Sequence, residues 1–165
     1  MPKAIPFPSN KEIEMQKIQS FQIDHDVLDP GIYVSRIDGD ITTYDLRTRK
    51  PNTGDVMDNV TMHSVEHMIA TFVRNSCIAD RVIYFGPMGC QTGFYLLVRN
   101  ADNAEVLAVL KQVLTQTIEH TGGVFGATQK ECGNFRTLDL ACAQKECAAY
   151  LAVLNAKEHS FQYAG

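Results

Sequence analysis

The stretch IYVSRIDGDITTYDLR, residues 32–47, decides the fold class of this chain. Residues 32–37 and 41–47 each favour a β-strand, and Gly39 lies between them where a hairpin turn is expected. Further along, the apolar run 82–85 and residues 94–98 predict two more strands, separated by a break at Gly86-Pro87-Met88-Gly89. Strands joined by short turns pair antiparallel, so these two hairpins predict a mainly antiparallel sheet.

Three helices are expected around these strands. One covers residues 61–76, and a second runs from Asp102, a suitable N-cap, to about His120, with Gly122 ending it. The third opens at Thr137 or Asp139 and runs to about residue 155. Because helices and strands alternate irregularly, we expect an α+β fold with two layers, a mainly antiparallel sheet packed against helices, in a single domain.

The first 25 residues carry weaker signals. Three prolines predict that residues 1–10 form an extended arm or a disordered tail, and residues 11–19 suit a short helix. The segment Ser20–His25 alternates apolar and polar residues, which predicts either a strand-like piece or the approach to a turn.

Composition excludes several functional classes. The chain has 165 residues, 45% of them hydrophobic, and a net charge of −4 without a basic run, so neither nucleic acid nor an anionic membrane is expected as a partner. No apolar stretch approaches the roughly 20 residues of a membrane span. The beginning lacks the apolar core of a secretory signal, and five cysteines are an odd number for a disulfide framework. We therefore expect a cytoplasmic protein with reduced thiols.

The sequence HSVEH, residues 63–67, places reactive groups on one face of the helix predicted at 61–76. His63 and His67 lie one turn apart, close enough to bind one ion, and Glu66 lies beside them, where it can act as a base. The opposite face carries Val65 and Met68 and suits a core. The alternative is a solvated polar face with two unrelated histidines, and the same H-x-x-E-H order also occurs in some metallopeptidases.

Two cysteines have unusual surroundings. Cys90 lies in Gly89-Cys90-Gln91-Thr92-Gly93, where glycines allow a ligand to approach the backbone. It is either an acid–base thiolate or a small buried apolar side chain. Cys132 precedes Gly133 in a polar loop, and a His2Cys ligand set would leave a fourth metal position open. We interpret the remaining thiols as structural: Cys77, Cys142 and Cys147.

Taken together, these segments resemble the LuxS family of S-ribosylhomocysteine lyases. The resemblance rests on SFQIDH (20–25), YDLR (44–47), HSVEH (63–67), GPMGCQTG (86–93) and ECG (131–133), which follow the order and similar spacing of the family. It runs from about Ser20 to the last helix. This implies an N-terminal extension at 1–19 and a single metal-dependent lyase domain at 20–165.

The resemblance implies a role for each matching residue. His63, His67 and Cys132 would bind a divalent metal, Fe(II) in the native family and replaceable by Zn or Co. Cys90 and Glu66 would be the two general acid/base residues. The remaining matches contact or orient substrate: Ser20, His25, Arg47 and Arg74.

The implied reaction cleaves S-ribosylhomocysteine to homocysteine and dihydroxypentanedione, the precursor of the autoinducer-2 quorum-sensing signal, within the activated methyl cycle. It proceeds by carbonyl migration along the sugar and β-elimination of the thioether. A homodimer with sites at the interface is also implied, with the segment that holds His25 reaching the site of the partner.

The chain departs from the family pattern at two places. Tyr84, Phe85 and Gly86 stand where an aspartate, an isoleucine and a serine are frequent, so a carboxylate contact to the sugar would be missing or supplied elsewhere. Arg49 stands at a position that is often cysteine. These departures affect substrate contacts and leave the metal and acid–base residues whole.

Two other functions fit part of the sequence. A small H-x-x-E-H metallopeptidase would commonly use a His2Glu ligand set and would not require Cys90. A non-catalytic metal-binding module would want a closed site with four protein ligands and no free acid/base pair. Peptide cleavage or a fourth protein ligand, respectively, would identify them.

Overall fold

A four-stranded antiparallel sheet is the centre of the computed structural model, which describes residues 15–164. Its strands are β1 (Gly31–Asp38), β2 (Ile41–Arg47), β3 (Val82–Pro87) and β4 (Gly93–Arg99). The order across the sheet is β1-β2-β4-β3, so two hairpins lie side by side and β2 pairs with β4. This confirms the predicted fold class, and Gly39 forms the first hairpin turn at a φ of 61°.

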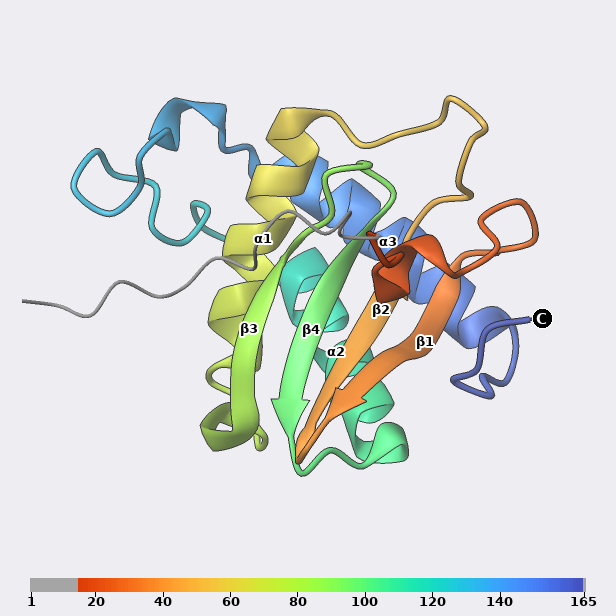
Figure 1. Cartoon of the computed structure of the whole chain (residues 1–165). Helices are drawn as coiled ribbons and strands as arrows, with labels where there is room; N and C mark the ends of the chain where they lie inside the picture. Colours follow the sequence, from red (N-terminus) through yellow and green to blue (C-terminus); the bar gives the residue numbers. More distant parts are fainter. Residues whose placement is uncertain (1–14, 165) are drawn as a thin grey trace, which may run out of the picture.

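Three α-helices cover one face of this sheet (Figure 1). They are α1 (Asn59–Val73), α2 (Asn103–Glu119) and α3 (Leu140–Ala156). Each begins at an aspartate whose side chain accepts a hydrogen bond from a backbone N–H three residues on: Asp58, Asp102 and Asp139. The second and third caps are where the sequence predicts them.

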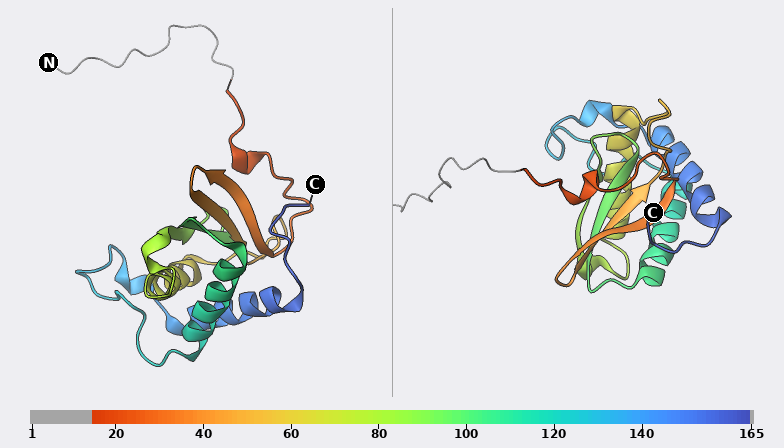
Figure 2. Two further views of the ribbon diagram at one scale, coloured as in Figure 1. Left: turned by 90° about the horizontal axis from the view of Figure 1, so that it is seen from below. Right: turned by 45° about the vertical axis from the view of Figure 1, so that its right-hand side comes forward.

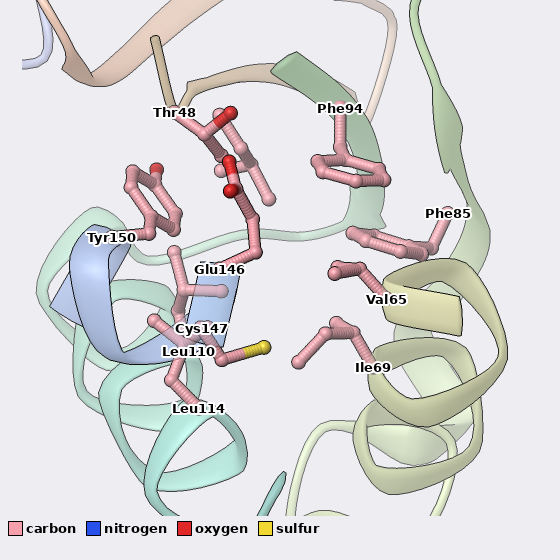
Figure 3. Close-up of a pocket in the computed structure, with 11 residues that line it drawn as sticks. Thr48, Val65, Ile69, Phe85, Phe94, Leu110, Leu114, Glu146, Cys147 and Tyr150 are labelled. Atoms are coloured by element: carbon pink, nitrogen blue, oxygen red, sulfur yellow. The ribbon is translucent and has the colours of Figure 1, made fainter. Parts of the chain in front are cut away.

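The core lies between the sheet and the helices, and the strand register decides which residues face it. Opposed residues on neighbouring strands share a face, so Leu46 and Phe94 form one inward row and Tyr44, Leu96 and Phe85 another. Phe85 and Phe94 stack with ring centroids 5.2 Å apart. Figure 3 shows this interior, where an apolar cavity of about 10 Å³ remains, barely enough for one water. The predicted helices and strands therefore close a well-packed core.

The opposite face of the sheet, called the outer face below, carries the other set of side chains. Register places Tyr33, Asp45 and Tyr95 in one row and Thr43, Leu97 and Tyr84 in the next. Within residues 15–164, no α-helix lies over this face (Figures 1 and 2). The C-terminal segment runs along β1 instead, where the N–H of Val34 donates to the carbonyl of Phe161 at 2.8 Å.

The weaker N-terminal predictions fare less well. Residues 1–14, which hold the predicted arm and the first four residues of the predicted helix, lie outside the described residues. Residues 15–18 are not helical, and only Gln19–Phe21 form a single 3₁₀ turn. Ser20–His25 is therefore a turn and not a strand, because its backbone has no neighbouring strand to pair with in the described structure.

Arg49, one of the departures from the family pattern, ties the end of β2 to α3. Its guanidinium forms two hydrogen bonds with Glu146, at 3.1 and 2.6 Å, and another with the exposed Asp55 at 2.8 Å. The Glu146 side chain is only 7% exposed, so its charge depends on this partner. The hydrogen bond to Glu146 raises the pKa of Arg49, which keeps the guanidinium charged. The presence of Arg49 at this position is thus explained by its ion pair with Glu146.

None of the helices within residues 15–164 has the length and apolar character that crossing a bilayer requires.

The contacts of Arg49 with Glu146 and with Asp55 predict that substitutions of Arg49 and of Asp55 destabilise the fold by different amounts. Arg49→Ala should lower the free energy of unfolding by about 2 kcal/mol, because it leaves the Glu146 carboxylate buried without a partner. Asp55→Ala should lower the free energy of unfolding by less than about 0.5 kcal/mol, because the Asp55 side chain is 77% exposed. Urea unfolding followed by circular dichroism measures both, and equal costs would contradict the assigned role of Glu146.

Candidate metal centre and acid–base loop

The two histidines of α1 and Cys132 converge on one point. The ligand atoms of His63, His67 and Cys132 all lie within 4.8 Å of one another, and Cys132 Sγ lies 3.3 Å from Nε2 of His63. All three side chains are half-buried, so neither histidine lies on the freely solvated face that the alternative interpretation required. Two imidazoles and one thiolate are ligands that bind Zn, Fe and related divalent ions.

The orientation of both imidazoles fits a metal. Nδ1 of His67 lies 2.7 Å from the carbonyl oxygen of Phe125, which only accepts hydrogen bonds, so Nδ1 carries the proton and Nε2 has a free lone pair. Nδ1 of His63 lies 2.8 Å from Oγ1 of Thr137, which itself donates to the carbonyl of Asn134. That hydroxyl is therefore an acceptor for His63. Both Nε2 atoms are left free for an ion, as second-shell oxygens typically arrange.

Room for the His67 ring comes from a glycine. Gly126 has a φ of 67°, and a Cβ there would lie 3.2 Å from Nδ1 of His67. A larger residue would be strained in this backbone conformation and would push against the ring. The segment Phe125-Gly126 is therefore shaped around the histidine.

The loop that carries Cys132 is folded to present its sulfur. The N–H of Cys132 donates to the carbonyl of Thr128 at 3.0 Å, and the N–H of Asn134 donates to Sγ of Cys132 at 3.4 Å. These two bonds hold the loop so that the sulfur of Cys132 is directed toward His63. On the helix side, buried Ser64 accepts from the N–H of Asp139 at 2.8 Å. This bond fixes the start of α3 against α1, next to the ligands.

Glu66 lies on the rim of a hollow beside the ligands. It shares this open depression with His67, Ala70, Thr71, Phe125 and Gly126. Its carboxylate is half-buried and next to the ligand His67, which is the position that a base acting on a metal-bound molecule requires.

Cys90 lies in the turn between β3 and β4, at the end of the sheet where α1 begins (Figure 1). Backbone bonds fix this turn: the N–H groups of Thr48 and Met57 donate to its carbonyls, at 3.0 and 2.9 Å. Gly93 closes it, because a Cβ there would lie 2.6 Å from the carbonyl oxygen of Leu46. Cys90 itself is exposed, so the interpretation as a buried apolar side chain is wrong.

A buried arginine stands behind this thiol. Arg47 is 2% exposed, and its Nη1 donates to Oγ1 of Thr92 at 2.8 Å and lies 3.7 Å from Sγ of Cys90. Burial opposes its charge, but Asp45 outweighs this, and the pKa of Arg47 is raised. A permanent guanidinium charge beside a thiol favours the thiolate. The arrangement suits a cysteine that accepts and returns protons.

The other residues that the resemblance assigns to substrate contacts lie apart from the metal-ligand cluster and from the turn that carries Cys90. Ser20 lines a hollow on the outer face together with Tyr84 and Tyr95. His25 is half-buried, with Nδ1 2.9 Å from the carbonyl of Ile23. Arg74 is exposed and donates to the carbonyls of Val82 and Ile83. Within one chain, the structure joins neither Ser20 nor His25 to the metal ligands.

The Tyr84 and Gly86 departures are coupled to each other. Both lie on the outer face of β3, and a Cβ at Gly86 would lie 2.0 Å from the hydroxyl of Tyr84. The tyrosine ring therefore lies along the strand over the glycine and requires it. Phe85 points the other way and belongs to the core stack with Phe94.

Several supporting groups carry no signal in the sequence motifs. Thr137 and the carbonyl of Phe125 orient the imidazoles, but nothing in their surroundings distinguishes them from ordinary loop residues. Asp45 gives a modest hint, since it precedes the predicted Arg47 by two residues on a strand and so shares its face. Thr92 belongs to the quoted Cys90 motif but was not singled out.

Comparisons with known proteins identify the family of the chain. A sequence profile described as S-Ribosylhomocysteinase (LuxS) matches residues 18–160. An S-ribosylhomocysteine lyase of Desulfotalea psychrophila is 43% identical over 157 residues, covering 90% of this chain and 99% of the relative. The lyase of Borreliella afzelii is 40% identical over 156 residues with the same coverage, and that of Finegoldia magna is 43% identical over 146 residues, 86% and 93% of the two chains. The chain therefore belongs to the S-ribosylhomocysteinase (LuxS) family.

Proposed function

We propose that this chain cleaves S-ribosylhomocysteine to homocysteine and dihydroxypentanedione, a precursor of the autoinducer-2 signal. One observation carries the proposal: in a member of this family, the His2Cys cluster and the Arg47–Cys90 pair are both intact. The Tyr84 and Arg49 departures lie outside these two groups, so they leave the reacting side chains unchanged.

The reaction consists of proton movements and one bond cleavage. The opened sugar moves its carbonyl from carbon one to carbon two and then to carbon three, each time losing a proton from one carbon and gaining one at its neighbour. Loss of a proton from carbon four then breaks the bond between carbon five and sulfur, and homocysteine leaves as a thiolate. Atoms balance without an oxidant or reductant.

Two bases divide this work. Cys90 takes and returns protons as a thiolate that Arg47 stabilises, while Glu66 acts from the helix beside the metal ligands. The proposal is supported by their separate origins, a turn of the sheet and α1. Protons on adjacent carbons are thereby reached from different sides of the sugar.

His63, His67 and Cys132 would hold one divalent ion, which we propose is Fe(II), with Zn or Co as substitutes. Such an ion would act as a Lewis acid on the carbonyl oxygen of the substrate. The protein holds its two imidazoles in the tautomer that leaves Nε2 free and contributes one thiolate. Three protein ligands leave a position for the substrate oxygen.

We also propose that a second copy of the chain covers the outer face of the sheet, forming a homodimer with sites at the interface. The support is the hollow on this face, lined in part by Tyr84, Tyr95 and Leu97, and the absence of any α-helix over the face within residues 15–164. The segment before β1 adds Ile18 and Phe21, which are 58% and 71% exposed. In such a dimer Ser20 and His25 would serve the site of the partner, while Arg47 and Arg74 would serve their own.

Residues 20–165 would form the catalytic unit and residues 1–19 an extension of it, since the family profile begins at residue 18. We place the enzyme in the cytoplasm. Its five cysteines are free, and the proposed roles of Cys90 and Cys132 require a reducing compartment.

Neither alternative function explains the whole site. A peptidase on the H-x-x-E-H helix has no use for a thiol held by a buried arginine. A closed metal-binding module needs a fourth protein ligand, and the cluster in the described residues has three.

Removal of Cys90 tests the proposed reaction directly. Wild-type protein purified without oxygen should release homocysteine from S-ribosylhomocysteine, measured with a thiol reagent. Cys90→Ala should lower kcat by at least about 100-fold, because a general acid/base residue contributes that much, and should keep its metal. Cys77→Ala removes another exposed thiol and should behave like wild type. Turnover by Cys90→Ala at the wild-type rate would refute its role, and peptide cleavage by the wild type would favour the peptidase.

The metal ligands are tested by binding alone. Cys132→Ala should weaken binding of a divalent ion by at least about tenfold, because one of three protein ligands is lost. Cys142→Ala, also half-buried but on α3, should retain one ion per chain. Elemental analysis after dialysis against a weak chelator gives both numbers, and full occupancy in Cys132→Ala would remove this residue from the ligand set.

The dimer is tested with one substitution on each face of the sheet. Leu97→Asp places a charge on the outer face and should convert the dimer to a monomer in sedimentation velocity. Ile37 pairs with Thr42 on the helix side of the sheet and is 66% exposed, so Ile37→Asp should remain a dimer. A monomeric wild type, or a dimer unaffected by Leu97→Asp, would contradict the proposed interface.

A further inference from the structure

A buried ion pair connects the C-terminal segment to the reactive turn. Asp45 and Arg47 face outward from β2, yet they are 0% and 2% exposed. Part of their cover is Tyr163, whose ring stacks on that of Tyr33 with centroids 4.9 Å apart. A charged pair is thus sealed on the face of the sheet that lacks helices.

The hydrogen bonds form an unbroken chain from this tyrosine to the thiol. The Tyr163 hydroxyl donates to Oδ2 of Asp45 at 2.8 Å. Arg47 donates to both oxygens of the same carboxylate, from Nε at 3.1 Å and from Nη2 at 2.6 Å. The opposite edge of the guanidinium reaches Thr92 and Cys90, whose Oγ1 and Sγ are 3.0 Å apart. The plane of the guanidinium is therefore fixed from the carboxylate side.

The hydroxyl of Tyr163 is suited to this role. Burial, followed by the charge of Asp45, raises its pKa, so it stays a neutral donor. Oδ2 of Asp45 accepts two hydrogen bonds, and without Tyr163 it would keep only the one from Arg47. Losing this donor leaves the buried carboxylate with an unmet acceptor, so we expect Arg47, its remaining partner, to turn toward Asp45 and away from Cys90.

We propose that Tyr163 is a positioning residue for the reaction at Cys90, acting through Asp45 and Arg47. The assignment rests on the proposed lyase function. It makes the C-terminal segment part of the reactive site, although this segment is distant in sequence from every motif that identifies the family.

Two hydroxyl deletions in the same aromatic stack test the proposal. Tyr163→Phe keeps the ring that stacks on Tyr33 and removes only the bond to Asp45. Tyr33→Phe is the matched control, because its hydroxyl donates to the carbonyl of Asp29 and not to the ion pair. We expect Tyr163→Phe to lower kcat about tenfold with KM changed less than twofold, since misorientation of a reacting group costs rate. Tyr33→Phe should leave both constants unchanged.

Alkylation of Cys90 by iodoacetamide at one fixed pH gives a second readout, with exposed Cys77 in the same molecule as the internal standard. If Tyr163 acts through Arg47, its loss weakens the stabilisation of the thiolate, and alkylation of Cys90 slows severalfold relative to Cys77. If Tyr163 only packs the segment, Arg47 keeps its place beside the thiol, and alkylation of Cys90 relative to Cys77 is unchanged or faster.

Slower alkylation together with a lower kcat supports the proposal. A kcat equal to that of the wild type overturns it. A lower kcat also overturns it if alkylation of Cys90 is unchanged or faster. A wild type that is inactive on S-ribosylhomocysteine would refute the proposed function instead, and the alkylation comparison would still report the coupling of Tyr163 to Cys90.

Discussion

The buried ion pair of Arg47 is the interaction on which the turn that carries Cys90 depends. Arg47 is the largest fully buried side chain in the described structure, and a buried charge is tolerated only when it is paired and hydrogen-bonded. Asp45 supplies the counter-charge from the same strand and face. With one edge of Arg47 held by this carboxylate, the other edge is aimed at the turn that carries Thr92 and Cys90. The pairing that a buried arginine requires thus places the positive charge of Arg47 next to the thiol of Cys90.

At the proposed metal site, hydrogen bonds from other segments orient the side chains that would bind the ion. A helix sets the spacing of His63 and His67 but not the tautomer of either ring. The hydroxyl of Thr137 and the carbonyl of Phe125 set that, each from a segment far along the chain. Gly126 provides the space that lets one of these segments approach. The ligands would be present without these contacts, but their lone pairs would not point to a common position.

Local patterns predicted most of the fold correctly. The strands around Gly39 and the N-caps Asp102 and Asp139 follow from alternation and from side-chain bonds to nearby backbone groups, which involve only neighbouring residues. Residues 20–25 have no partner strand in the described structure, and of the two outcomes that their alternation allowed, the turn is the one observed. Contacts between distant segments had no local signal. Cys132 lies 69 residues from His63 and was placed by family resemblance, and Tyr163 lies 118 residues from Asp45 and was not foreseen.

In the proposed site, three protein ligands leave one metal position open to substrate. The optical spectrum of cobalt(II)-loaded Cys90→Ala protein, recorded with and without S-ribosylhomocysteine, tests it most directly. An open His2Cys site predicts a thiolate-to-cobalt charge-transfer band, together with ligand-field bands that change when substrate binds without being consumed. A spectrum without the thiolate band, or one that saturating substrate leaves unchanged, would contradict the claim and indicate a closed centre.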